Sequence, residues 1–312
     1  MGNDIIGMHH VTAISGDAQA NHDFYVKVLG QRMVKKTVNF DAPDVYHLYY
    51  ADYAGTPGTV MTFFPFQGAR RGRVGRGQVT ETFYAVPTGS LDYWAARIAA
   101  HGGTVLGRGE AFGEARLVAS DPEGLGLTLI ERADDRDPWT GTVPAAQAVR
   151  GFAGVALGVG QEGSMRAILE GVFGYERVGE EAAGGATRIR YAKPGEPTAV
   201  VELVIDPAMP EGVEAAGTVH HVAFRVADRA AQKRVQAASA AAGHRVTPQI
   251  DRDYFWAIYF RTPEGILFEV ATDEPGFDRD EPVETLGESL KLPSQHEHLR
   301  PALERSLPAL VA

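Results

Sequence analysis

The chain has 312 residues, a length that suits two domains of ordinary size, and 44% of them are hydrophobic, which is enough to form a buried core. The formal net charge of -10 argues against nucleic acids and anionic membranes as partners, because both bind basic surfaces. The absence of cysteine excludes disulfides and thiolate metal sites, so a bound metal needs histidine, carboxylate or backbone oxygen ligands.

Four segments of the chain have the periodicity of a helix, and each is followed by a glycine that suits a left-handed helix cap. In chain order they are residues 17–29, 90–101, 164–173 and 228–242, followed by Gly30, Gly102, Gly174 and Gly243. Successive glycines are about 70 residues apart, a spacing that unrelated helices would rarely keep. The spacing indicates an internal repeat.

Strand-like runs rich in Val, Phe, Tyr and Thr surround each helix, with one run before it and three after it. The runs before the helices are residues 9–15, 81–86, 152–159 and 219–226. In the first repeat the later runs are 32–40, 45–51 and 59–64, and in the last they are 244–250, 256–261 and 266–271. The sequence therefore predicts an α+β protein of four βαβββ modules.

The modules are expected to form two domains separated by the polar stretch 133–150. Modules at about residues 5–66 and 78–132 make up an N-terminal domain, 1–140. Modules at about residues 151–206 and 217–273 make up a C-terminal domain, 150–280, and a tail follows at 281–312.

The strongest local signal is the repetition of His-His-Val on the first strand of the first and last modules. Side chains alternate between the two faces of a strand. In the last module the face of His220 is otherwise apolar and is predicted to pack, whereas the face of His221 has room and polarity. The same alternation separates His9, which is predicted to pack, from His10. The pattern therefore predicts that His10 and His221 face a cavity.

A lone carboxylate, Glu269, lies within an apolar strand of the last module. Such a group is costly there unless it is paired or bound to a metal. Two histidines and one carboxylate leave half of an octahedron open, which suits a non-haem Fe(II) that binds a substrate and O2 together, although Mn(II) fits the same ligands. Structural histidines are the simpler alternative. Glu202 has a similar place in the third module, but no histidine accompanies it on that module's first strand, so no second complete site is expected.

Three further residues have both a functional and a structural interpretation. Tyr259, on the strand before that of Glu269, can hydrogen-bond a substrate oxygen or be an ordinary sheet aromatic. Arg252 can balance an anionic ring or belong to a surface loop, and His47 can line the pocket or pack within its strand.

Two segments outside the four modules are expected to be structural and not catalytic. Residues 68–77 are basic and glycine-rich but lack the spacing of a phosphate loop, so a solvated loop or a subunit contact is expected. The tail has Leu299, Leu303 and Leu307 at helical spacing and is expected to pack on the body or on a second subunit. Self-association is left open.

These features resemble the vicinal-oxygen-chelate superfamily, which includes glyoxalase I, bleomycin-resistance proteins and extradiol ring-cleaving dioxygenases. A closer resemblance, to the hydroquinone ring-cleaving dioxygenases, rests on residues 9–12, 24–32, 46–52, 55–62, 220–221 and 261–269. The resemblance implies that the modules pair into cup-shaped mixed sheets flanked by helices, with the first and fourth modules sharing one cup.

The resemblance also implies roles for particular residues. It implies that His10, His221 and Glu269 bind Fe(II), and it gives candidate catalytic residues around the metal, namely His9, Thr12, His220, Arg252 and Tyr259. For His9 and His220 this disagrees with the alternation argument, and a β-bulge would reconcile the two.

The function implied is an Fe(II)-dependent dioxygenase that inserts O2 into a hydroquinone or catechol-type aromatic. Its expected partners are a small aromatic diol and O2, and its expected location is cytoplasmic, since no signal peptide or membrane-spanning run is present. One alternative is a glyoxalase-like lyase or isomerase, which would use a fourth ligand on the last strand of the first module, where only Met61 and Thr62 are available. The other is a binding protein without turnover, which would leave the three matched residues unexplained.

Overall fold

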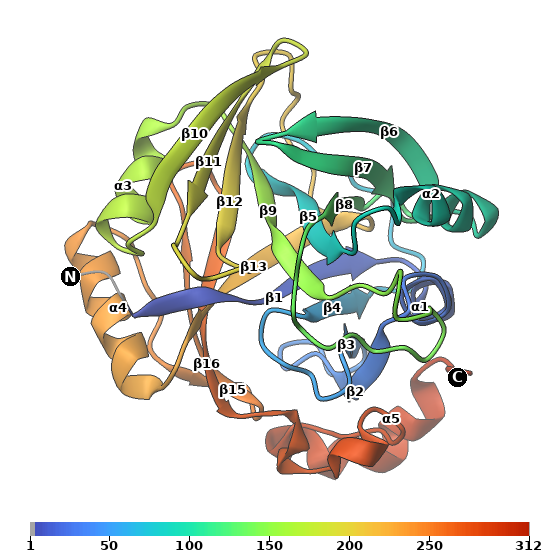
Figure 1. Cartoon of the computed structure of the whole chain (residues 1–312). Coiled ribbons are helices and arrows are strands. Elements are labelled where there is room, and N and C mark those ends of the chain that lie inside the picture. Colours follow the sequence, from blue (N-terminus) through green and yellow to red (C-terminus); the bar gives the residue numbers. More distant parts are fainter. Residues whose placement is uncertain (1–3, 312) are drawn as a thin grey trace.

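Two mixed β-sheets of eight strands each, both curled into half-barrels, form the body of the protein (Figure 1). The computed structural model describes residues 4–311. Residues 1–3 of the expected first domain and residue 312 of the expected tail lie outside that range. No helix within the described range is both long and apolar enough to cross a membrane.

The first sheet combines the first and fourth modules. In spatial order its strands are β14 (Ile250–Asp251), β15 (Phe255–Arg261), β16 (Leu267–Pro275), β13 (Thr218–Val226), β1 (Ile5–Ser15), β4 (Val60–Pro65), β3 (Tyr46–Ala51) and β2 (Arg32–Val38). Strands β1 and β13 pair antiparallel at the centre, with β4 parallel to β1 and β16 parallel to β13. The strand order is therefore symmetrical about the β1–β13 pair.

The second sheet combines the second and third modules in the same way. Its strands in spatial order are β10 (Glu176–Ala183), β11 (Ala186–Ala192), β12 (Val200–Ile205), β9 (Gly151–Val159), β5 (Gln78–Val86), β8 (Gly126–Glu131), β7 (Glu114–Ser120) and β6 (Thr104–Ala111). Each sheet thus joins modules from opposite halves of the chain. Residues 132–150 form neither helix nor strand, and a division there into domains 1–140 and 150–280 remains a proposal.

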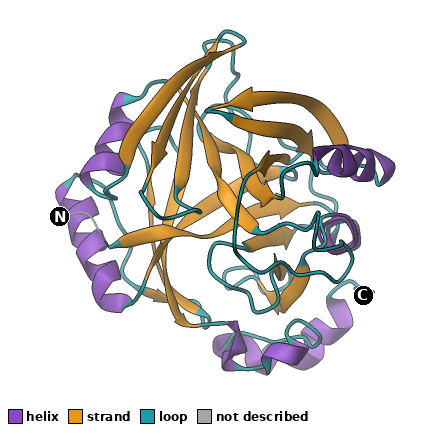
Figure 2. Ribbon diagram, in the orientation of Figure 1, coloured by secondary structure: helices purple, strands orange, loops and turns teal. Residues whose placement is uncertain are grey.

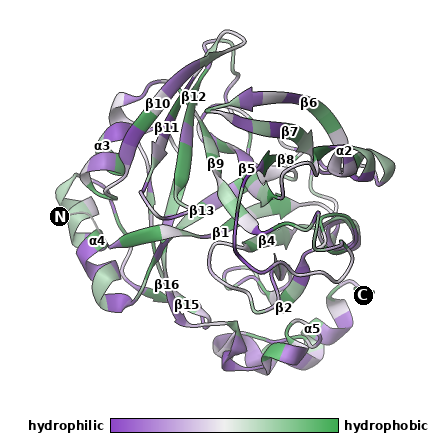
Figure 3. Cartoon of the chain, viewed as in Figure 1, coloured by the Kyte–Doolittle hydropathy of each residue, from purple (hydrophilic) through white to green (hydrophobic). Residues whose placement is uncertain are grey.

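Every module contains its predicted helix, and the helices surround the strands (Figure 2). They are α1 (Ala18–His22), continued by a π-helix (Asp23–Val28), α2 (Leu91–Ala100), α3 (Gly163–Gly171) and α4 (Arg229–Ala241). Hydrophilic and hydrophobic residues alternate along these outer helices, as expected for helices with one face against a sheet (Figure 3). The predicted cap glycines have φ angles of 73°, 85°, 69° and 91°, in the left-handed region that glycine adopts without steric cost.

The predicted strand 244–250 is wrong for most of its length, because only Ile250 at its end lies in a strand, β14. Pro248 has no N–H to donate to a ladder. The segment is held instead by Thr247, whose N–H donates to the Tyr259 carbonyl over 3.0 Å and whose Oγ1 accepts from the Tyr259 N–H over 2.9 Å.

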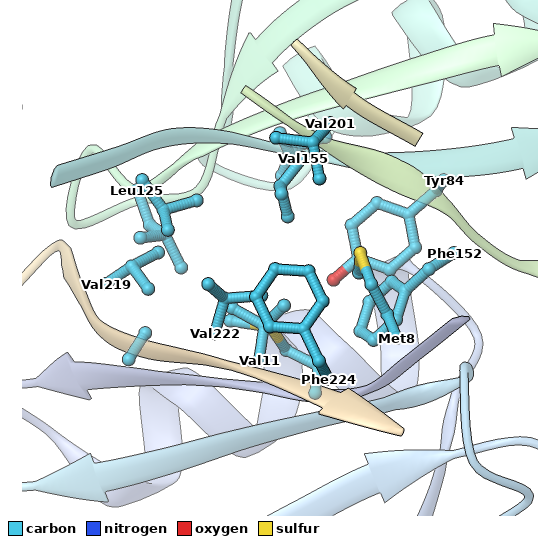
Figure 4. Close-up of a cluster of buried hydrophobic side chains, with 14 of the residues drawn as sticks. Met8, Val11, Tyr84, Leu125, Phe152, Val155, Val201, Val219, Val222 and Phe224 are labelled. Atoms are coloured by element: carbon cyan, nitrogen blue, oxygen red, sulfur yellow. The ribbon is translucent and has the colours of Figure 1, made fainter. Parts of the chain in front are cut away.

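A large apolar core lies between the two sheets (Figure 4). Met8, Val11 and Phe224 of the first sheet face Tyr84 and Val155 of the second, and all five are buried. Because this face of the first sheet is filled, its other face is the one that can line a site.

The tail packs on its own chain, one of the two contacts expected for it. It contains two 3-10 helices (Val283–Thr285 and Ser294–Leu299) and helix α5 (Arg300–Ser306), and a further 3-10 helix (Phe277–Arg279) precedes the tail. The buried Lys35 of edge strand β2 bonds Asp280 and Glu281, each over 2.6 Å. The neighbouring Lys36 forms a β-bridge with Leu290. The tail thereby covers one edge of the first sheet.

The basic loop 68–77 also makes internal contacts. Arg71, Arg73 and Arg76 form isolated β-bridges with Ala216, Val213 and Glu211. The loop that joins the first two modules therefore pairs with the loop that joins the last two.

Candidate metal centre

Three central strands of the first sheet bring His10, His221 and Glu269 together. On β1 and β13, His10 lies opposite Ala223 and Thr12 lies opposite His221, while Glu269 on β16 lies beside Ala223. The His10 and His221 Nε2 atoms are 3.2 Å apart, and they lie 3.4 and 2.9 Å from Glu269 Oε2. The three ligand atoms lie within 4.8 Å of one another, and all three residues are buried.

The buried carboxylate tests whether this cluster fits a metal. Glu269 is 0% exposed, yet neither of its oxygens accepts a hydrogen bond from any residue in the described part of the chain. The nearest nitrogen, His221 Nε2, lies 2.9 Å from Glu269 Oε2 as an ion-pair contact and not as a hydrogen bond. A buried carboxylate without hydrogen bonds is costly, and a cation between the three atoms would satisfy it. The donor set therefore fits a divalent metal, and its role as ligands stays a prediction.

Two β-bulges place His9 and His220 beside the ligands. Met8 and His10 of β1 pair with Phe224 and Ala223, which are consecutive residues of β13, so His9 is an extra residue on β1. On β13, His221 and Val219 pair with consecutive residues of β1, so His220 is the extra residue there. A bulge turns its extra residue out of the regular alternation. The prediction that both side chains lie on the packing face is therefore wrong, because His220 lines the cavity and each histidine bonds its neighbouring ligand.

The bulge histidines, His9 and His220, hold the imidazoles of His10 and His221 in a defined orientation. His9 Nδ1 is 2.9 Å from His10 Nδ1, and His220 Nδ1 is 2.7 Å from His221 Nδ1. With protons on the Nδ1 atoms of His10 and His221, their Nε2 atoms are free for a metal, and His9 and His220 act as acceptors. Burial lowers the pKa of His9 well below its ordinary value and also lowers that of His220, which favours neutral acceptors.

A cavity of about 660 Å³ opens above the cluster. Its walls are largely aromatic and aliphatic, and they include Ile14, Phe40, Phe64, Phe66, Phe255 and Leu267. Its polar lining residues, apart from the cluster, are Asn39, Asp41, His47, Tyr49, Glu214, His220, Thr247, Arg252 and Tyr259. A small aromatic molecule fits a cavity of this size and composition.

Tyr259 and Arg252 form one polar wall. Tyr259 pairs with Glu269 across β15 and β16, and Arg252 Nε donates to its hydroxyl over 3.2 Å. Burial and the Glu269 charge raise the pKa of Tyr259 well above its ordinary value, so the phenol stays protonated. Arg252 also reaches Asp41 at 3.4 Å, and so joins the interior of the cavity to its mouth.

Thr12 and His47 lie in a hydrogen-bonded chain on the other side. Thr12 Oγ1 is 2.7 Å from Thr62 Oγ1, and Thr62 Oγ1 is 2.9 Å from His47 Nε2. His47 therefore lines the cavity, one of the two placements considered for it. Sequence reasoning missed Tyr49, whose hydroxyl lies 2.8 Å from His47 Nδ1. The signal was the two-residue spacing from His47, which puts both side chains on one face of β3.

The symmetry of the sheet explains why three candidate ligands meet here and not four. Glu269 lies beside Ala223, two residues after His221, and Thr62 lies beside Thr12, two residues after His10. Thr62 therefore occupies the position equivalent to Glu269. Its hydroxyl is bonded to Thr12 and His47.

The second sheet fills the corresponding place with ion pairs. Its pairing register puts Glu202 beside Ala156, as Glu269 lies beside Ala223. Glu202 accepts hydrogen bonds of 2.6 to 3.1 Å from Arg116, Arg188 and Arg190. Burial alone would raise the pKa of Glu202, but the arginines outweigh it and lower the pKa to about 2. This carboxylate is already satisfied by protein groups.

The fold and the cluster define a class: proteins built from paired βαβββ modules with a buried two-histidine, one-carboxylate group at the seam between two modules. The chain belongs to the Glyoxalase/Bleomycin resistance protein/Dioxygenase superfamily, whose family model matches residues 7–129 and 151–270. This membership confirms the superfamily resemblance and the predicted fold class.

Several relatives match nearly the whole chain. MhqO of Bacillus subtilis, named as a candidate ring-cleaving dioxygenase, is 44% identical over 309 residues, which cover 98% of this chain and 97% of the relative. The chlorohydroquinone/hydroquinone 1,2-dioxygenase of Sphingobium indicum is 35% identical over 310 residues, covering 96% of this chain and 95% of the relative.

Solved structures show the same architecture. The crystal structure of a candidate dioxygenase from Bacillus subtilis matches with a TM-score of 0.94 and 44% identity, over 99% of both chains. Glyoxalase I from Zea mays matches with a TM-score of 0.63 and 18% identity, over 86% of this chain and 92% of that one, and shows the fold alone.

Proposed function

We propose that this protein is an Fe(II)-dependent ring-cleaving dioxygenase that inserts O2 into a hydroquinone, with His10, His221 and Glu269 as the metal ligands. The observation that carries the proposal is the buried carboxylate without a hydrogen bond between two facing imidazole nitrogens. The names of full-length relatives support the reaction class and the diol substrate. Mn(II) fits the same ligands, and the cytoplasmic location expected from the sequence belongs to the proposal.

The arrangement of three ligands favours this function over a glyoxalase-like lyase. A lyase of that kind was expected to use a fourth ligand on β4, but the equivalent position holds Thr62, whose hydroxyl is bonded within the protein. Fe(II) with open positions supplies the electron path between an ionised diol and O2.

The residues of the cavity have distinct tasks in this proposal. The aromatic walls exclude water from the ring, and Arg252 balances the charge of an ionised diol or of the ring-opened acid. Tyr259, protonated and beside Glu269, can donate a proton to an oxygen of the substrate. His220, whose Nδ1 is engaged with His221, is a second candidate for proton transfer.

The test is O2 uptake by protein reconstituted with Fe(II) under anaerobic conditions, with methylhydroquinone, chlorohydroquinone and catechol compared in parallel. Uptake that requires both iron and a hydroquinone is expected. Uptake with catechol alone would keep the chemistry and change the substrate class. No uptake with any diol, in protein that holds its metal, would overturn the proposal.

A further inference from the structure

The first sheet places two cavity-lining tyrosines at equivalent positions on either side of its central strand pair, one on β15 and one on β3. Tyr259 pairs with Glu269 across β15 and β16, and Tyr49 pairs with Thr62 across β3 and β4. Because the strand order is symmetrical about β1 and β13, Tyr49 is the counterpart of Tyr259. Both line the cavity, but only Tyr259 is next to the carboxylate of the cluster. Tyr49 therefore lines the cavity on the β3 side, with β4 between it and the strand of His10.

The hydroxyl of Tyr49 is held in place and still has capacity for a ligand. It lies 2.8 Å from His47 Nδ1, and His47 Nε2 lies 2.9 Å from Thr62 Oγ1, which in turn lies 2.7 Å from Thr12 Oγ1. A phenol can donate one hydrogen bond and accept others. If Tyr49 donates to His47, its oxygen can accept from a ligand; if His47 donates, the Tyr49 proton is available.

The second hydroxyl of a bound diol needs a hydrogen-bonding partner such as the Tyr49 hydroxyl. With one oxygen of the diol at the metal cluster, the oxygen at the other end of the ring is carried away from the cluster into a cavity lined by both apolar and polar side chains, Tyr49 among the polar ones. A buried hydroxyl without a partner costs free energy, so a partner at that end favours the diol over a phenol that lacks the second hydroxyl.

We propose that Tyr49 binds the second hydroxyl of a para-diol and so selects diols over monophenols, with His47 as the residue that positions it. The identity of the diol rests on the proposed function, whereas the contact rests on the geometry of the cavity. Burial lowers the pKa of His47 and raises that of Tyr49, in each case well away from the ordinary value, so both groups are neutral. The contact is then worth one neutral hydrogen bond, about a 5-fold change in affinity.

The test measures binding of hydroquinone and of phenol by calorimetry, without O2, to protein loaded with Mn(II). Tyr49→Phe is expected to raise the Kd of hydroquinone about 5-fold and to leave the Kd of phenol within about twofold. Tyr50→Phe is the matched control, because the neighbouring side chain lies on the other face of β3, within the core, and its loss is expected to change neither Kd. An equal change for both ligands, or no change for hydroquinone, would overturn the assignment.

Variants of His47 separate positioning from general disturbance of the cavity. His47→Leu is expected to weaken hydroquinone selectively, and His47→Gln, which keeps a hydrogen-bonding group, is expected to recover part of the loss. Selective binding in protein that takes up no O2 with any diol would remove the proposed dioxygenase function and leave Tyr49 in its role. O2 uptake with a hydroquinone, combined with binding that does not distinguish hydroquinone from phenol in the way predicted, would keep the dioxygenase function and remove Tyr49 from its proposed role.

Discussion

The surroundings of the buried Glu269 carboxylate indicate that it can bind a metal ion. The residue is 0% exposed, and its Oε2 atom lies 3.4 Å from His10 Nε2 and 2.9 Å from His221 Nε2. Neither carboxylate oxygen accepts a hydrogen bond from residues 4–311. A metal is the remaining kind of partner that the donor set suits.

Glu269→Gln is predicted to keep the fold and lose the metal. The amide has the same size, so secondary structure is expected to be unchanged, and removal of a buried charge is not expected to lower the melting temperature of the metal-free protein. Metal affinity is expected to fall at least about 100-fold, with loss of O2 uptake. Metal content after dialysis measures this, with Glu214→Gln at the cavity wall as the control. Full metal content in Glu269→Gln would remove Glu269 from the site.

At the scale of the elements, Glu202 occupies the position of the second sheet that corresponds to Glu269 in the first sheet. It is fully buried among three arginines, and breaking a buried ion-pair network leaves charges without partners. Glu202→Gln is predicted to lower the free energy of unfolding by about 3 kcal/mol at pH 7 without changing metal content. Urea denaturation measures the loss, and Glu110→Gln on the exposed part of β6 is expected to change the free energy by less than about 0.5 kcal/mol.

The pH dependence of that loss has a definite sign. The pKa of Glu202 is depressed from 4.5 to about 2, so its ion pairs stabilise the folded protein fully above pH 4.5. Their contribution is lost as the pH falls from 4.5 towards 2. The difference between the natural protein and Glu202→Gln should therefore be smaller at pH 3.5 than at pH 7, and an unchanged difference would contradict the assignment of the charge.

The sequence predicts elements well where the signal is local. Helix period and cap glycines identified all four helices, and alternation predicted that His10 and His221 share a cavity. Alternation failed at His9 and His220, because a bulge exists only relative to a partner strand, here one more than 200 residues away. Alternation puts Tyr49 on the same face of β3 as His47, but the pattern of β3 does not show which of its faces is the inner one.

At the scale of the whole molecule, the tail acts as the cover of one sheet edge. Val34 of β2 is buried in one apolar cluster with Leu286 of the tail and with Phe277 just before it. A chain that ends after Gly276, and so lacks Phe277 and Asp280 as well as the tail from Glu281 onwards, is predicted to expose this edge, which invites pairing with other chains. Hydrogen exchange of the β2 amides is expected to be several-fold faster, and that of the β13 amides unchanged. A chain that ends after Leu310 is the control, and full protection of β2 in the shorter chain would show that the edge needs no cover.

The pairing of the first and fourth modules affects when the candidate metal centre can form during synthesis of the chain. The strand with His10 leaves the ribosome early, but its partner β13 and the carboxylate of Glu269 are translated more than 200 residues later. At ordinary rates of synthesis that interval is about 13 to 50 s. During it the nascent chain has one histidine pair and no third ligand, so the ion can be captured only by a chain that is nearly complete. If these residues bind a metal, its loading is coupled to the end of translation, because a product truncated before Glu269 lacks one of the three proposed ligands.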